Sequence, residues 1–260
     1  MALTLFTLIR TAWISDDAAI SLRTVLNFIN GYGPVFNVGE RVQAYTHPLW
    51  FFVISGLTWI TGNVFYSSFA LSIAASLAVI WLLITRVANT IWAGVFAAAI
   101  VLFSKAYSDY STSGLENPLS HLLLVGIAIV AAHWHVSDSE KRFKPLCFFF
   151  ILCGLLLLNR HDLALLAAPL ALYVMWESRS QLGALLMAMT IGAVPIILWE
   201  AFSLFYYGIA VPNTAYAKLG AGISKSELIQ QGWLYYANQP AMIPVTMAAN
   251  VIGSRLIESA

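Results

Sequence analysis

The sequence predicts an all-helical protein that crosses a membrane several times, and three observations support this fold class. Of its 260 residues, 60% are hydrophobic and only 10% are charged, whereas an ordinary soluble domain has about 25% charged residues. Its apolar residues form several long runs, as membrane spans require. These runs are continuous, which favours helices over the alternating pattern of a membrane β-barrel.

The apolar runs place about seven or eight membrane-spanning helices along the chain. The first run, residues 1–13, is broken by Arg10 and would be about 20 Å long as a helix, against a hydrocarbon core of ~30 Å. We interpret it as a spanning helix that is truncated at its start or follows a late start codon. The later spans are predicted at 64–85, 91–106, 118–135, 145–159, 163–176 and 183–206, with a last apolar stretch beginning near residue 241.

The segment 49–62 is apolar but short, so we expect a re-entrant or interfacial helix there. The short connection 137–144 contains three basic residues, which places it in the cytoplasm by the positive-inside rule. The first outer loop, 15–48, then lies outside the cytoplasmic membrane. We expect residues 1–260 to form one transmembrane domain without a separate soluble domain.

This topology gathers ionisable and polar residues on the extracytoplasmic side, where their cost at membrane depth makes them candidates for a functional site. They are Asp16, Asp17, Asp109, Glu116, Arg160, His161, Asp162, Asn213 and Lys218. Structural roles are also open. Asp16 could cap a helix that starts at Ala18, "GLENP" could be a helix end followed by Pro118 in the next first turn, and "NRHD" could be a polar turn.

Two carboxylates near basic side chains suit the transfer of a group from a lipid-linked phosphate. One carboxylate can accept a proton from an attacking hydroxyl, and basic groups can neutralise a phosphate leaving group. Aromatic residues such as Tyr45 can stack on sugar rings, or can belong to an interfacial belt. The sequence has no metal, P-loop or dinucleotide motif, although paired acids can bind a divalent cation. A net charge of +1 gives no reason to expect nucleic acid.

Four stretches of the chain, in order, carry recognisable motifs. The longest is "DDAAISLRTVLNFINGYGPVFNVGERVQAYTHPLW", residues 16–50, and the others are "SGLENPL", "NRHDLALL" and "VPNTAYAK". Together they resemble membrane glycosyltransferases of the GT-C superfamily, and within it the group of mycobacterial cell-wall arabinofuranosyltransferases, whose segments corresponding to the three shorter stretches are SGLETPL, R-P-D-G-L and P-N-T-x-x-x-K. The chain departs from the pattern at Asn117, where Thr is usual, at His161, where Pro is usual, and at Gln43-Ala44, where Glu-Gly is usual.

The resemblance implies an active site that faces away from the cytoplasm, a polyprenyl-phosphate sugar as donor, a glycan as acceptor and an essential Asp early in the first outer loop. Asp16 or Asp17 would be the general base. Glu116 and Asp162 would contact the acceptor or the donor. The donor phosphate would be bound by Arg23, Arg41, Arg160, His161 and Lys218, and Tyr45, His47 and Asn213 would complete the substrate-binding set.

The sequence therefore favours a hexosyl- or pentosyltransferase in the bilayer that needs no cofactor, with a divalent cation left open. A transporter or flippase of a lipid-linked or small polar substrate is the alternative class, and it would place ionisable residues at the bilayer midplane. An inactive, truncated family member is a third reading, because relatives generally have more helices and often a soluble C-terminal domain.

Overall fold

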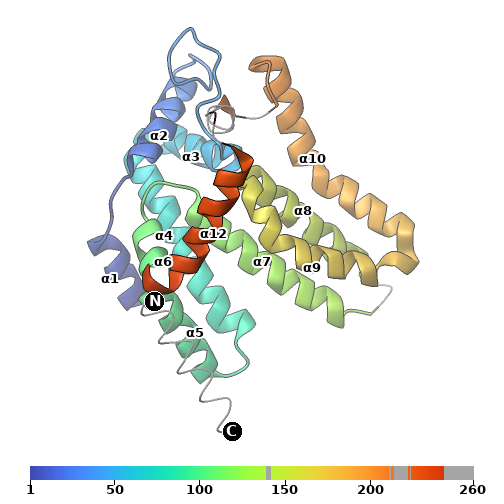
Figure 1. Ribbon diagram of the computed structural model, residues 1–260. Coiled ribbons are helices and arrows are strands. Elements are labelled where there is room, and N and C mark those ends of the chain that lie inside the picture. Colours follow the sequence, from blue (N-terminus) through green and yellow to red (C-terminus); the bar gives the residue numbers. More distant parts are fainter. Residues whose placement is uncertain (139–141, 211, 214–221, 223, 243–260) are drawn as a thin grey trace. The chain divides into compact units, whose positions relative to one another are not determined.

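The computed structural model describes residues 1–138, 142–210, 212–213, 222 and 224–242. The chain divides into two compact units, Met1–Thr214 and Ala215–Ala260. Every regular element in the described part of the chain is a helix (Figure 1). The all-helical prediction is therefore confirmed.

Among the residues that the structure describes, three helical stretches are long and apolar enough to cross a membrane. The first joins α4 (Val64–Leu82) to a π-helical turn, η1 (Leu83–Val87). The second is α7 (Asn117–Val136), and the third joins the short turn η4 (Arg179–Gln181) to α10 (Leu182–Tyr206). They coincide with the predicted spans 64–85, 118–135 and 183–206, and they indicate a membrane protein.

The remaining apolar helices in the described part of the chain are shorter, so the predicted count of seven or eight crossings is not confirmed. They are α3 (Pro48–Thr61), α5 (Ile91–Phe103), α8 (Phe143–Asn159) and α9 (Ala164–Glu177). At 14 residues, α3 reaches about 21 Å, well short of a ~30 Å core. A helix therefore forms in the predicted segment 49–62, and its re-entrant or interfacial placement stays a prediction. The apolar stretch that begins near 241 lies almost entirely outside the described residues.

Four further elements are short or polar. They are α1 (Ala2–Arg10), α2 (Asp16–Ile29), α6 (Lys105–Tyr110) and the 3-10 turn η3 (His161–Leu163). In the second unit, α12 covers Lys225–Met242. Part of the predicted outer loop 15–48 is thus the helix α2, and its N-cap is Ser15, whose hydroxyl accepts from the amide of Ala18 at 3.1 Å. The predicted capping role of Asp16 is wrong, because α2 begins at Asp16 itself and Ser15 occupies the N-cap position.

The loop between α2 and α3 is fixed by hydrogen bonds to α2 and to Tyr207, the residue that follows α10. Asn27 of α2 donates through its side-chain amide to the carbonyls of Val35 and Phe36, at 2.9 and 3.0 Å. Tyr207, directly after α10, donates its hydroxyl to the carbonyl of Pro34 at 2.6 Å. The same hydroxyl lies 3.1 Å from that of Tyr45, so the loop is held against helices at both of its ends.

The core of the first unit depends on close backbone packing between α8 and α10. These two helices form the most extensive helix pair, followed by α7 and α8 (Figure 1). A Cβ atom added at Gly154 would overlap the carbonyl of Gly192, and one added at Gly192 would overlap that of Phe150. Small residues at such contacts are how helices approach closely in a membrane.

We therefore expect Gly192→Ala to destabilise the protein by about 1–3 kcal/mol, the usual cost of overpacking. Gly183→Ala is the matched control, because it lies in the same helix and a Cβ there meets no atom within 4 Å; its effect should stay within about 1 kcal/mol. Thermal unfolding in detergent micelles measures both. Equal unfolding midpoints for the two variants would contradict the proposed contact.

Candidate functional site

The site is built on Glu116, the last residue before α7. Gly114 has a φ of +82°, which favours glycine, and a Cβ there would lie 2.8 Å from that of Ala18 in α2. The indole of Trp50 in α3 donates to the carbonyl of Gly114 at 3.0 Å. The amide of Ser15 donates to the carbonyl of Ser113 at 2.9 Å. This turn is therefore wedged between α2 and α3.

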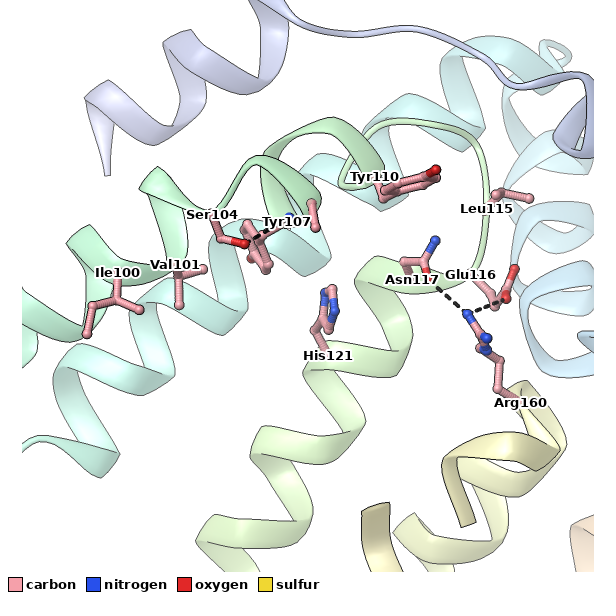
Figure 2. A pocket seen from close by; sticks show the side chains of 11 residues that line it. Ile100, Val101, Ser104, Tyr107, Tyr110, Leu115, Glu116, Asn117, His121 and Arg160 are labelled. Atoms are coloured by element: carbon pink, nitrogen blue, oxygen red, sulfur yellow. Dashed lines mark hydrogen bonds and ion pairs between the residues drawn. The ribbon is translucent and has the colours of Figure 1, made fainter. Parts of the chain in front are cut away.

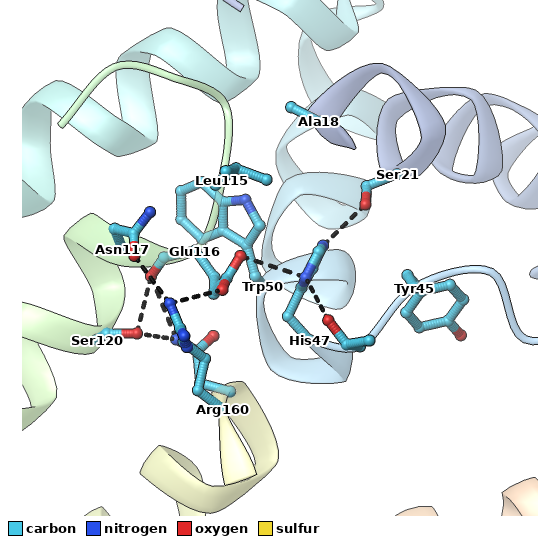
Figure 3. Close-up of polar contacts among 12 residues, drawn as sticks. Ala18, Ser21, Tyr45, His47, Trp50, Leu115, Glu116, Asn117, Ser120 and Arg160 are labelled. Carbon is cyan, nitrogen blue, oxygen red and sulfur yellow. Dashed lines mark hydrogen bonds and ion pairs between the residues drawn. The ribbon is translucent and has the colours of Figure 1, made fainter. Parts of the chain in front are cut away.

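Figure 3 shows the carboxylate of Glu116 between His47 and Arg160. Its Oε2 lies 3.2 Å from Nδ1 of His47, and its Oε1 lies 3.4 Å from a terminal nitrogen of Arg160. Only 7% of Glu116 is exposed. A buried carboxylate needs such partners, because an unpaired charge in a protein interior costs several kcal/mol. We call His47, Glu116, Arg160 and Asp162 the Glu116 cluster.

His47 connects this cluster to α2. Its Nε2 lies 2.8 Å from the hydroxyl of Ser21. Burial lowers the pKa of His47, although the charge of Glu116 counters this effect. The ring is therefore neutral, and it donates from Nδ1 to Glu116 and accepts at Nε2 from Ser21. Serine, histidine and a carboxylate in a row resemble a hydrolase triad, but Ser21 is only 3% exposed and cannot reach a substrate.

Arg160 donates hydrogen bonds to two neighbouring side chains. Its Nε and one terminal nitrogen donate to the two carboxylate oxygens of Asp162, at 3.0 and 2.6 Å, and its other terminal nitrogen donates to the side-chain oxygen of Asn117 at 3.1 Å. The bond from Arg160 lowers the pKa of Asp162, and the same bond raises that of Arg160. Two carboxylates outnumber one guanidinium, so the cluster is negative overall.

Asn159, at the end of α8, holds the start of α7 in place. Its side-chain amide donates to the hydroxyl of Ser120 at 2.9 Å and to the carbonyl of Glu116 at 3.3 Å. Asn159 is completely buried. Arg160 follows Asn159 directly in the chain, so these two hydrogen bonds also help to position the Arg160 side chain.

Asp16 and Asp17 occupy the exposed first turn of α2. Residues four apart lie on one face of a helix, so Asp17 shares a face with Ser21, which touches His47. The charge of Asp17 also acts on the pKa of His47, as a smaller effect than burial and Glu116. Asp16 instead accepts from the amide of Asp17 at 3.0 Å. Asp17 is therefore the aspartate on the side of the Glu116 cluster.

Two of the other predicted site residues, Arg23 and Arg41, pack on aromatic rings. The guanidinium of Arg23 lies over the ring of Phe36, and that of Arg41 over the ring of Tyr206, at 4.3 and 5.1 Å. Tyr45 is 1% exposed and stacks on Phe51, so its ring has a core role in place of an exposed stacking surface. His161 and Asn213 are exposed. Lys218 lies outside the described residues.

A pocket of about 600 Å³ opens beside the cluster, between α5, α6 and the start of α7 (Figure 2). Its lining residues are Ile100, Val101, Ser104, Ala106, Tyr107, Tyr110, Leu115, Glu116, Asn117, His121 and Arg160. Sequence reasoning did not identify His121, Ser21 or Asn159 as members of a site. Among the described residues, no group of three or more His, Cys, Asp or Glu side chains is placed to hold a metal ion.

The lowered pKa of His47 predicts how stability depends on pH. The unfolded chain takes up a proton near the ordinary histidine pKa of about 6.5, whereas the buried ring resists it. The contribution of His47 is therefore complete above that pH and is lost as the pH falls, by at most about 1.4 kcal/mol per pH unit. Thermal unfolding at pH 7.5 and 5.5 should show a smaller loss for His47→Gln than for the native chain. His161→Gln, at an exposed histidine, is the control substitution. If His47→Gln lost as much stability between pH 7.5 and 5.5 as the native chain, that result would contradict a neutral His47.

Comparison with known proteins identifies two relatives. The chain is 30% identical over 245 residues to a terminal β-(1→2)-arabinofuranosyltransferase of Mycobacterium tuberculosis, covering 87% of the chain and 37% of that protein. It is 33% identical over 252 residues to a protein of the same name from Corynebacterium glutamicum, covering 86% and 35%. The chain thus spans little more than a third of the length of the curated relatives it matches. No family model and no solved structure matches. The resemblance to arabinofuranosyltransferases is confirmed: over most of its length, this chain is homologous to part of these bacterial enzymes.

Proposed function

We propose that this chain forms the active-site part of a membrane glycosyltransferase that moves a pentosyl unit from a polyprenyl-phosphate donor to a glycan acceptor. The single observation that carries the proposal is that three of the four motif stretches, far apart in the sequence, meet in one place. The first outer loop supplies His47, "SGLENPL" supplies Glu116, and "NRHDLALL" supplies Arg160 and Asp162. The pentosyl donor is proposed from the printed name of the relatives.

In this proposal Asp17 is the general base. It is exposed on the face of α2 that leads to His47, so an acceptor hydroxyl can approach it. The hydroxyl oxygen bonds to the anomeric carbon of the donor as the bond from that carbon to the phosphate oxygen breaks. Asp17 takes the hydroxyl proton, and polyprenyl phosphate leaves with the electron pair. General bases of this kind contribute about 10²–10⁴-fold to a rate.

The positive charge of Arg160 first suggests a contact with the donor phosphate, but we assign Arg160 a positioning role. The guanidinium of Arg160 contacts Asp162, Asn117 and Glu116, so we assign it the role of positioning these groups. We assign the donor phosphate to the basic residues that remain, the exposed Arg23 and Arg41 and Lys218. His161, also exposed, stays in this proposed set.

We place this site on the extracytoplasmic face of the cytoplasmic membrane. The basic connection 137–144 favours the cytoplasm, and α7 leads from the Glu116 cluster toward it. The transporter alternative finds less support, because the ionisable side chains of the cluster lie in turns at helix ends instead of within spans.

The proposal predicts that Asp17→Asn lowers sugar transfer at least about 100-fold, and that Asp16→Asn lowers it less, because Asp16 bonds to its own neighbour. Membranes that contain the protein are incubated with radiolabelled polyprenyl-phosphate sugars, with an arabinofuranosyl donor among them, and label in glycan is counted. Both aspartates are exposed, so the unfolding midpoint of each variant should equal that of the native chain. A rate of sugar transfer in Asp17→Asn equal to that of the native chain would refute Asp17 as the general base. A stably inserted native chain that transfers none of the sugars would support the inactive alternative.

A further inference from the structure

The pocket beside the Glu116 cluster has a polar end and an apolar end. Glu116, Asn117 and Arg160 line the first, and Ile100, Val101 and Ala106 line the second. Figure 2 shows His121 between the two ends, facing the ring of Tyr107. Such a pocket combines apolar walls with a few convergent polar groups, which is typical of a small-molecule site.

The charges at the polar end disfavour an anion. Arg160 is the one cationic side chain in the lining; its nitrogens already donate to the carboxylate of Asp162 and to the side-chain oxygen of Asn117, and one of them forms an ion pair with Glu116 at 3.4 Å. The carboxylate of Glu116 therefore faces the pocket without a spare positive charge beside it. A ligand hydroxyl can donate to that carboxylate, whereas a phosphate would be repelled by it.

His121 supplies a donor at the middle of the pocket. Its Nδ1 is buried without a hydrogen-bond partner in the described structure, and its ring stacks on Tyr107 with centroids 5.1 Å apart. A donor left buried without a partner is costly, so we assign the proton of the ring to Nε2, which leaves His121 one N–H to offer a ligand in the pocket that it lines. His121 lies one turn after Asn117 on the same face of α7.

Asn117 adds a second donor. Its side-chain oxygen accepts from Arg160 at 3.1 Å, and this bond orients the amide so that its nitrogen points away from Arg160, toward Tyr110 (Figure 2). The pocket thus presents one strong acceptor, Glu116, and two neutral donors, Asn117 and His121. This is the pattern that a polyhydroxyl ligand needs and that an anionic head group does not.

Two tyrosines give the pocket rigid aromatic walls. Tyr107 donates its hydroxyl to the carbonyl of Ser76 at 3.1 Å, which fixes its ring. The ring of Tyr110 packs edge-on against Trp13, at 6.3 Å between centroids, and the indole of Trp13 donates to the carbonyl of Asp109 at 2.7 Å. Because Trp13 leads into the first turn of α2, this wall connects the pocket to the segment that carries Asp16 and Asp17.

We propose that this pocket binds a neutral saccharide unit, with Glu116 accepting from a sugar hydroxyl, Asn117 and His121 donating to sugar oxygens, and Tyr110 packing on the C–H face of the ring. The inference rests on the proposed function and assigns it a sugar subsite. The saccharide is either the sugar of the lipid-linked donor or the end of the acceptor glycan, since both offer the same hydroxyls.

The experiment compares His121→Leu, which removes the donor, with His121→Gln, which keeps one. His133→Leu is the matched control, because His133 is exposed near the other end of the same helix. Binding of an arabinofuranosyl oligosaccharide to the purified protein in detergent is measured by saturation-transfer NMR, and the KM values for donor and acceptor are measured separately. Loss of one neutral hydrogen bond should weaken binding about 3- to 10-fold in His121→Leu, with His121→Gln and His133→Leu within about twofold of native.

The KM that rises in His121→Leu, at an almost unchanged kcat, identifies the source of the sugar as donor or acceptor. Unchanged oligosaccharide binding and unchanged KM values in His121→Leu would overturn the subsite. So would an equal weakening for polyprenyl phosphate that carries no sugar, since the pocket would then hold the lipid. If the native protein binds the oligosaccharide through His121 but transfers no sugar, the proposed function fails while the saccharide subsite stands.

Discussion

The buried carboxylate of Glu116 is the constraint on which the rest of this site depends. A charge that is 7% exposed must be paired, or it costs several kcal/mol. Its partners come from segments 69 and 44 residues away along the numbering, at His47 and Arg160. The glycine at position 114, the tryptophan that donates to its carbonyl, and the asparagine at the end of α8 all place the turn so that this pairing is possible.

This pairing also changes how the basic residues are understood. A guanidinium next to a proposed donor site suggests a phosphate contact at first sight. Here the same guanidinium is bidentate to Asp162 and also contacts Glu116, so it positions the acids around it. The cluster is negative overall, so it favours neutral, hydroxyl-bearing groups over phosphate.

Much of the fold could be predicted from the sequence, because membrane helices are written in it as continuous apolar runs. The three long spans and the start of α7 at "GLENP" follow from run length and from Pro118 in the first turn. The number of crossings could not be predicted in the same way. Short runs such as 49–62 are apolar enough to be buried, yet their length leaves open whether they cross.

The candidate site was predicted only at residues that are ionisable or that belong to a recognised motif. His47, Glu116, Arg160 and Asp162 were identified because motif resemblance or an ionisable group at a span end drew attention to them. Ser21, Asn159 and His121 are single polar residues within helices, and their partners come from packing between distant segments. Tyr45 shows the reverse case. Its hydroxyl meets that of Tyr207, 162 residues away, and no local pattern reveals that this aromatic ring is buried.

The most direct test of a single paired site is a double-mutant cycle between His47 and Glu116. Unfolding free energies would be measured for His47→Gln, Glu116→Gln and the double variant, at a pH where the native ring is neutral. Groups that share a buried hydrogen bond should give a coupling energy of about 0.5–3 kcal/mol. The account predicts a value in that range. Effects that add to within about 0.3 kcal/mol would contradict it, because the two side chains would then not depend on each other.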